Sequence, residues 1–92
     1  MPNIKSAIKR MKQNEKRRIR NRYFRGRARA LVRDARAAIE SEDLDQAREA
    51  TIKAASALDK AAVKGILHEN NASRRKGRLM QQLADLEKKL AE

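Results

Sequence analysis

The sequence predicts an all-α protein: a three-helix antiparallel bundle with a long basic N-terminal helix that extends beyond it. Ala, Glu, Lys, Leu and Arg make up 55 of the 92 residues, a composition typical of long helices. One Pro and three Gly leave few positions at which a helix would break. At this length we expect a single domain, residues 1–92, in which a basic arm at 1–23 precedes the bundle at 24–92.

The first predicted helix carries apolar residues on two different faces. One face comprises Ile4, Ile8, Met11 and Ile19. The other lies roughly opposite and comprises Phe24, Ala28, Leu31, Val32, Ala35 and Ile39. One neighbouring hairpin cannot bury both faces, so we expect residues from about 24 to 40 to pack in the bundle. Residues before about 20 would extend past it and stay disordered until they bind a partner.

Two further helices are expected after a turn near residues 40–43. Asp43 followed by Gln46 resembles a capping box, and Gly65 is a residue type that commonly ends helices. The inner face of this second helix comprises Leu44, Ala47, Thr51, Ala54, Ala55, Leu58, Ala61 and Ala62. Asn70 or Asn71 is then expected to cap the third helix. Its inner face comprises Ala72, Leu79, Leu83, Leu86 and Leu90, with Arg74 and Arg78 opposite.

Positive charge is concentrated in the first third of the chain. Residues 1–36 hold 14 basic and two acidic residues, so their net charge of +12 equals that of the whole chain. At 100° per residue the cations form two stripes. The first comprises Lys5, Lys9, Lys12, Lys16 and Arg20; the second comprises Arg18, Arg22, Arg25, Arg29, Arg33 and Arg36. A merely solvated face would include acids to limit repulsion, so the stripes predict a polyanionic partner.

The composition excludes several functional classes. With one His, no Cys and no glycine-rich phosphate loop, the sequence shows no enzyme constellation, and we expect neither a cofactor nor a metal site. No apolar run reaches the length of a membrane span, so we expect an intracellular, cytoplasmic protein. Arginine donates to phosphate in a bidentate fork, and only Tyr23 and Phe24 could stack on bases. These features favour a folded RNA, bound through phosphates and riboses.

Some assignments remain open from the residues alone. A basic helical, nucleoid-type DNA-binding protein is the alternative function, and a basic helix lying on anionic membranes is a second. For His68, capping or packing and an RNA contact are equally expected. For Tyr23, plain packing is favoured over an RNA contact. Asn14, Asn21, Asn70 and Asn71 can add hydrogen bonds to sugars or bases, with capping an equal alternative for the last two.

Two blocks of residues carry a family resemblance over essentially the whole chain. The first comprises Asn3, Ile4, Lys5, Ser6, Ala7, Lys9, Arg10, Asn14, Lys16, Arg17, Arg18, Arg20 and Asn21. The second comprises Asp59, Ala61, Ala62, Lys64, Gly65, His68, Asn70, Ala72, Arg74, Lys76, Arg78 and Leu79. In their order and spacing the chain resembles the bacterial small-subunit ribosomal protein number twenty family. It departs from the pattern at Gly26 and Ala30, where hydroxyl residues are frequent, and at Gly77, where Ser is common.

The resemblance implies a structural constituent of the small ribosomal subunit. It implies direct binding to 16S ribosomal RNA, a monomer within the subunit and few or no direct protein partners. It also implies that His68 contacts RNA. Together with the stripes, it defines the predicted RNA-binding residues: Lys5, Ser6, Lys9, Arg10, Lys12, Asn14, Lys16, Arg17, Arg18, Arg20, Asn21, Arg22, Arg25, Arg29, Arg33, His68, Asn70, Asn71, Arg74, Arg75, Lys76 and Arg78.

Overall fold

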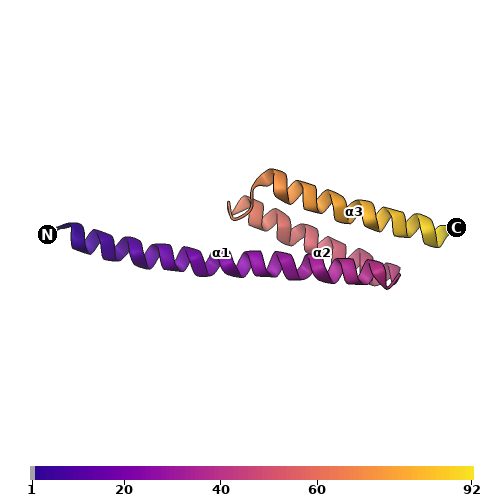
Figure 1. The fold of residues 1–92 in the computed structure, drawn as a ribbon, viewed down its shortest axis with the longest axis horizontal. Helices are drawn as coiled ribbons and strands as arrows, with labels where there is room; N and C mark the ends of the chain where they lie inside the picture. The colour runs from indigo at the N-terminus through magenta and orange to yellow at the C-terminus, as the bar shows by residue number, and fades with distance from the viewer. Residues whose placement is uncertain (1) are drawn as a thin grey trace.

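The computed structural model describes residues 2–92, which form three helices and no strand. Helix α1 spans Pro2–Glu40, α2 spans Leu44–Val63 and α3 spans Glu69–Ala91. The chain runs up, down and up again, so α2 is antiparallel to both of its neighbours (Figure 1). The all-α fold with a long first helix is therefore confirmed. Within the described residues, no helix has the length and apolar character to span a membrane.

Helix α1 is continuous over 39 residues, about 58 Å at 1.5 Å per residue. It accounts for most of the 72 Å length of the molecule, and its first half projects beyond α2 and α3 (Figure 1). The expected disorder before residue 20 is wrong for this structure, which shows helix there. Helical hydrogen bonds are internal to the segment, and its Lys, Arg and Met residues favour helix, which accounts for the helix seen there.

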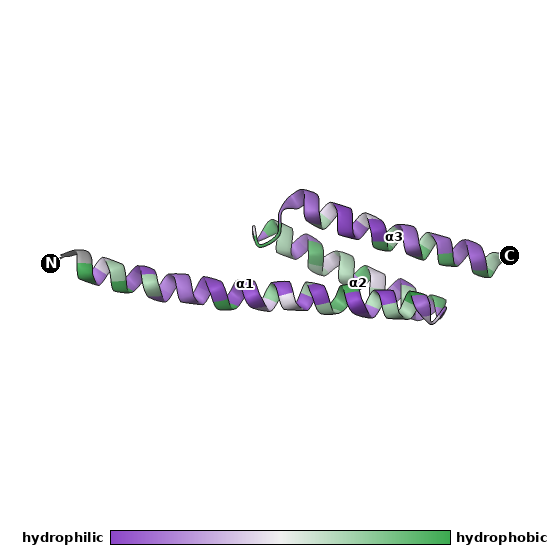
Figure 2. Ribbon diagram, viewed as in Figure 1, coloured by the Kyte–Doolittle hydropathy of each residue, from purple (hydrophilic) through white to green (hydrophobic). Residues whose placement is uncertain are grey.

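The core lies between α2, the central helix, and its two neighbours. It is built from Ala28, Val32 and Ala35 of α1, Ala54, Ala57 and Leu58 of α2, and Ala72 and Leu79 of α3. Five of these eight residues are alanines, whose small side chains let the helix backbones approach closely. Leu58 and Leu79 are the largest fully buried apolar side chains. Figure 2 shows apolar segments along much of α2, whereas on the arm apolar segments alternate with longer polar ones.

Both ends of α2 have the predicted local chemistry. The Asp43 side chain caps the helix by accepting a hydrogen bond of 3.3 Å from the backbone N–H of Gln46. At the other end Gly65 has φ of +74°, the left-handed conformation that glycine adopts without steric cost. The N–H of Gly65 donates to the Ala62 carbonyl, and the N–H of Ile66 donates to the Ala61 carbonyl. These two hydrogen bonds define a Schellman motif.

Two expectations for α3 are wrong. Its N-cap is His68 and neither Asn70 nor Asn71, because His68 has an extended backbone and its side chain reaches the orphan N–H of Asn70. Leu90, expected on the inner face, is 45% exposed. Its neighbour Lys89 pairs with Glu42 in the α1–α2 turn, so Leu90 lies where the other two helices have already ended.

Candidate nucleic-acid interface

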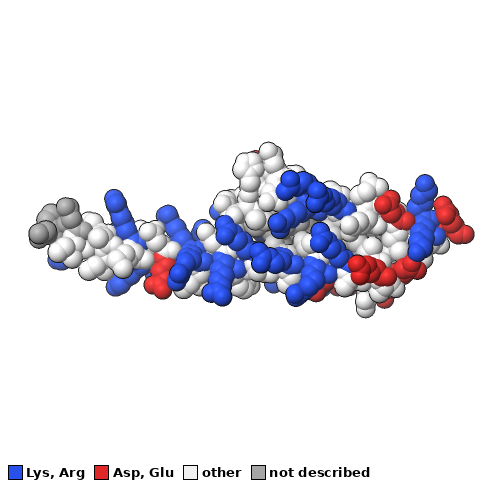
Figure 3. All heavy atoms as spheres, in the orientation of Figure 1, with Lys and Arg blue, Asp and Glu red and all other residues white. Residues whose placement is uncertain are grey.

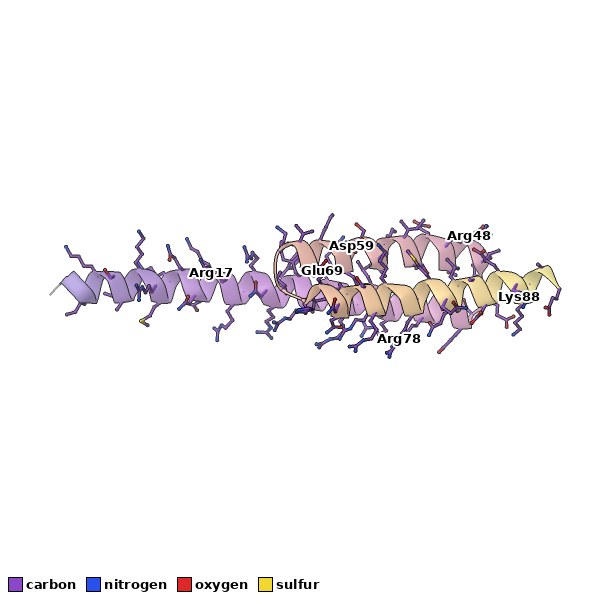
Figure 4. The ribbon with its side chains drawn as sticks, turned by 90° about the horizontal axis from the view of Figure 1, so that it is seen from above. Arg17, Arg48, Asp59, Glu69, Arg78 and Lys88 are labelled. Carbon is purple, nitrogen blue, oxygen red and sulfur yellow. The ribbon has the colours of Figure 1, made fainter. Side chains whose placement is uncertain are left out.

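The cationic side chains of the arm are exposed to solvent, and neither α2 nor α3 covers them. Every side chain from residue 4 to residue 20 is exposed, including all predicted RNA-binding residues in this range. The one carboxylate there is Glu15, which lies 3.9 Å from Arg18 Nη2. Such an exposed ion pair contributes little to stability. Lysine and arginine side chains point away from the helix in several directions along the arm (Figure 4). The arm can therefore contact a polyanion on more than one side.

The second stripe continues onto the bundle, where it meets cations from α3. Arg29, Arg33 and Arg36 of α1 and Arg74, Arg75 and Arg78 of α3 line one groove of about 560 Å³. We call it the six-arginine groove. Val32 and Ala37 give it apolar lining, and Glu40 is the one acidic residue that lines it. Basic side chains from α1 and α3 face one another here in Figure 3, and those around Arg78 extend from one side of the bundle in Figure 4.

Among the described residues, none of the six guanidinium groups has an ion-pair partner within 4 Å. The ion pairs of the described residues all lie outside the groove: Arg18–Glu15, Arg48–Glu87, Lys53–Glu49, Lys76–Asp59 and Lys89–Glu42. The groove brings together five of the predicted residues and adds Arg36. Arg36 belongs to the second stripe but is not among the predicted RNA-binding residues, although the continuation of that stripe is a signal for it.

The groove on the other side of α1 has a different charge pattern. It is lined by Asp34, Glu49 and Lys53, together with uncharged residues of α1 and α2. Lys53 Nζ lies 3.1 Å from Glu49 Oε1, so its charge is partly compensated. Acidic residues also gather at the end of the molecule opposite the arm, visible as the red atoms in Figure 3. One side of α1 therefore faces a strongly basic groove, whereas the other side faces a groove with both acidic and basic residues.

Several predicted RNA-binding residues have contacts within the protein. Arg25 Nη2 donates to the Ile66 carbonyl oxygen at 3.4 Å, and His68 Nδ1 accepts from the Asn70 N–H at 3.1 Å. Lys76 Nζ lies 3.2 Å from Asp59 Oδ2. Asn21 and Asn71 are half-buried, and the Oδ1 atom of each has no hydrogen-bond partner. The region near the α2–α3 turn thus combines structural contacts with unused polar groups.

The aromatic pair at the base of the arm lies among cations that are not among the predicted RNA-binding residues. Tyr23 is 60% exposed and meets Phe24 edge to face, with ring centroids 5.2 Å apart. Lys64 Nζ lies 4.9 Å from the Phe24 ring centroid, a cation–π contact. Arg27 and Lys60 line the hollow beside the pair. Arg27 follows Arg20 by seven residues, so it lies on the face of the first stripe, two turns beyond the residues that define that stripe.

Comparison with known proteins identifies the family of the chain. The family model of Ribosomal protein S20 matches residues 2–84. The small ribosomal subunit protein bS20 of Thermomicrobium roseum is 47% identical over 88 residues, which cover 96% of this chain and 89% of that protein. The bS20 protein of Shouchella clausii is 48% identical over 86 residues, covering 94% and 98%. That of Geobacillus kaustophilus is 47% identical over 87 residues, covering 95% and 98%. The exposed basic arm and the three-helix bundle described above therefore belong to a member of the ribosomal protein S20 family.

Proposed function

We propose that this protein is a structural constituent of the small ribosomal subunit that binds 16S ribosomal RNA directly and stabilises its folded arrangement during assembly. Relatives that this chain matches over 89% and 98% of their length are named as small ribosomal subunit proteins. Membership of this family makes the protein a structural component and not an enzyme. The observation that carries the RNA-binding part is the continuous run of exposed and largely unpaired cations from the arm to the six-arginine groove.

The mechanism is electrostatic and geometric. Neighbouring RNA segments repel one another through their phosphates, and Lys and Arg side chains placed between them offset that repulsion. Because the arm carries cations in two stripes, one helix can contact phosphates on two sides. A helix that is already formed loses less conformational entropy on binding than a disordered segment would. The bundle anchors that helix at one end.

The predicted residues form two regions of this proposed interface. The first is the arm, whose members run from Lys5 to Arg22. The second surrounds the six-arginine groove and the start of α3. Exposed side chains such as Arg17 and Arg74 are proposed to contact phosphate, whereas Ser6 and Asn14 are proposed to donate to or accept from ribose and phosphate oxygens. We further propose that the protein is monomeric within the subunit, with few or no direct protein partners.

The salt dependence of binding to folded 16S ribosomal RNA tests the proposal. If about eight phosphates are neutralised, the logarithm of the association constant falls with the logarithm of salt concentration at a slope of about −6 to −7. Duplex DNA, used as competitor at one fixed salt concentration, tests the alternative of a nucleoid-type DNA-binding protein. A shallow slope, or stronger binding to duplex DNA than to the folded RNA, would contradict the proposal.

A further inference from the structure

The six-arginine groove concentrates positive charge between two helices. Six guanidinium groups from two helices line it, and Glu40 is the one carboxylate beside them. Each guanidinium group carries a positive charge, so the six groups repel one another. The groove between α1 and α2, lined by Asp34, Glu49 and Lys53, has no such excess. The concentration of charge is therefore specific to the α1–α3 side.

The packing of α3 makes this repulsion act on the fold itself. Helix α3 buries Ala72, Leu79 and Leu86, and it packs mainly on α2 and much less on α1. The arginines of α1 and α3 therefore face each other across the weakest of the three helix interfaces. Val32 and Ala37 add apolar lining to the groove. In the free protein, repulsion between the arginines of α1 and those of α3 therefore opposes the packing of α3 on α1.

We propose that the six-arginine groove binds closely spaced RNA phosphates, and that their binding holds α3 against α1 and so stabilises the bundle. This proposal rests on the proposed function. It adds a specific RNA-binding site and an effect of binding on the stability of the bundle. Arg29, Arg33 and Arg36 span about 10 Å along α1, at 1.5 Å per residue, which is long enough for more than one phosphate. Phosphates between the helices would replace repulsion by charge-assisted hydrogen bonds to both of them.

Thermal unfolding of the full-length protein tests the stabilisation directly. Sodium tripolyphosphate is the probe, compared with sodium chloride at matched ionic strength. We expect tripolyphosphate to raise the Tm by about 5 °C or more at concentrations well above its Kd. The double variant R33Q/R78Q should lose most of this rise. Without phosphate and at low salt, it should also have a higher Tm than the unmodified protein, because repulsion in the groove is reduced.

A matched variant controls for the general effect of charge. R17Q/R20Q removes the same two charges from the arm, outside the bundle, so it should keep the full rise in Tm. No rise in the unmodified protein, or an equal loss of the rise in both double variants, would overturn the proposal. Both double variants change exposed side chains, and neither removes a core contact.

Binding of the same proteins to folded 16S ribosomal RNA separates this proposal from the proposed function. R33Q/R78Q should flatten the salt slope by about two. An unchanged affinity and slope in this variant, with binding by the unmodified protein intact, would overturn the groove as an RNA site while leaving the proposed function in place. Failure of the unmodified protein to bind the RNA would overturn both.

Discussion

Arg25 Nη2 donates a hydrogen bond to the carbonyl oxygen of Ile66, 3.4 Å away and 41 residues later in the chain. Ile66 is 6% exposed and follows the glycine that ends α2, so the contact ties α1 to the α2–α3 turn. A guanidinium that satisfies a carbonyl of the protein has fewer donors for phosphate. Arg25 therefore differs from the other members of the second stripe, although the sequence pattern treats them alike.

Arg25 and Arg22 should separate a structural role from an RNA-binding role. We expect Arg25→Gln to lower the free energy of unfolding by about 1 kcal/mol, the usual net worth of one hydrogen bond, and to change the RNA salt slope by less than one. Arg22→Gln removes an exposed charge one turn earlier and should show the reverse, with a slope flatter by about one. Urea unfolding and RNA titration of both variants check this. Identical behaviour of the two variants would contradict it.

The cap at His68 should be replaceable by a residue that caps equally well. His68→Ala removes the acceptor of the Asn70 N–H and should cost about 1 kcal/mol of stability. His68→Asn keeps a capping acceptor and should restore most of that loss. RNA affinity measured on the same pair separates the two roles of this side chain. If His68→Asn is stable yet binds RNA more weakly, the imidazole contacts RNA in addition to capping α3.

The alanine-rich core should tolerate neither loss nor gain of volume. Leu58 is fully buried, and Leu58→Ala should destabilise the bundle by about 2–5 kcal/mol through lost burial and a cavity. Ala54 is also fully buried, and Ala54→Leu should cost about 1–3 kcal/mol by forcing the helices apart. Ile52→Ala, at a 69% exposed position of the same helix, is the control and should stay within about 0.5 kcal/mol. Chemical denaturation measures all three.

The glycines at 65 and 77 should respond to alanine in opposite directions. Gly77 lies inside α3, and a methyl group added to its Cα would point into open space, so Gly77→Ala should stabilise the protein by up to about 1 kcal/mol through helix propensity. Gly65 has a positive φ, so Gly65→Ala should lower stability by about 1 kcal/mol. Thermal unfolding at low protein concentration checks both signs. A stabilising Gly65→Ala would show that the Schellman motif is not needed at this turn.

The arm should contribute to RNA affinity without contributing to folding. Arg17→Gln and Arg10→Gln change exposed side chains that touch no part of the bundle, so the Tm should stay unchanged. Each should flatten the RNA salt slope by about one if the side chain contacts a phosphate. Lys53→Gln, on the mixed-charge side of the bundle, is the control and should leave the slope unchanged. An equal effect of Lys53→Gln would mean that only net charge matters.

Local chemistry makes most of the fold predictable. The three helices, the Asp43 cap and the Gly65 terminator follow from spacing and from residues within a few positions of one another. The cap of α3 is predicted at Asn70 or Asn71 because asparagine is the commoner capping residue, whereas for His68 capping is only one of the expected roles. Leu90 is misplaced because periodicity predicts a face but not where the neighbouring helices end. Ala57, absent from the predicted face of α2, is buried because two helices flank α2.

The groove depends on contacts that no local pattern contains. The stripe on α1 and the arginines of α3 are both visible in the sequence. That they line one groove depends on how α3 packs on α2. The same holds for Arg25, whose partner lies 41 residues away. Residue spacing therefore identifies which cations are exposed. It does not identify which of them act together.

The order in which the helices pack has a consequence for the rate of folding. Each of the two main interfaces joins helices that are consecutive in the chain, through connections of only a few residues. Such local topology gives a low contact order, and helical domains of this kind fold within microseconds to milliseconds. The bundle is therefore expected to be complete well before a large RNA has finished folding. A newly made chain would then meet its RNA as a finished bundle.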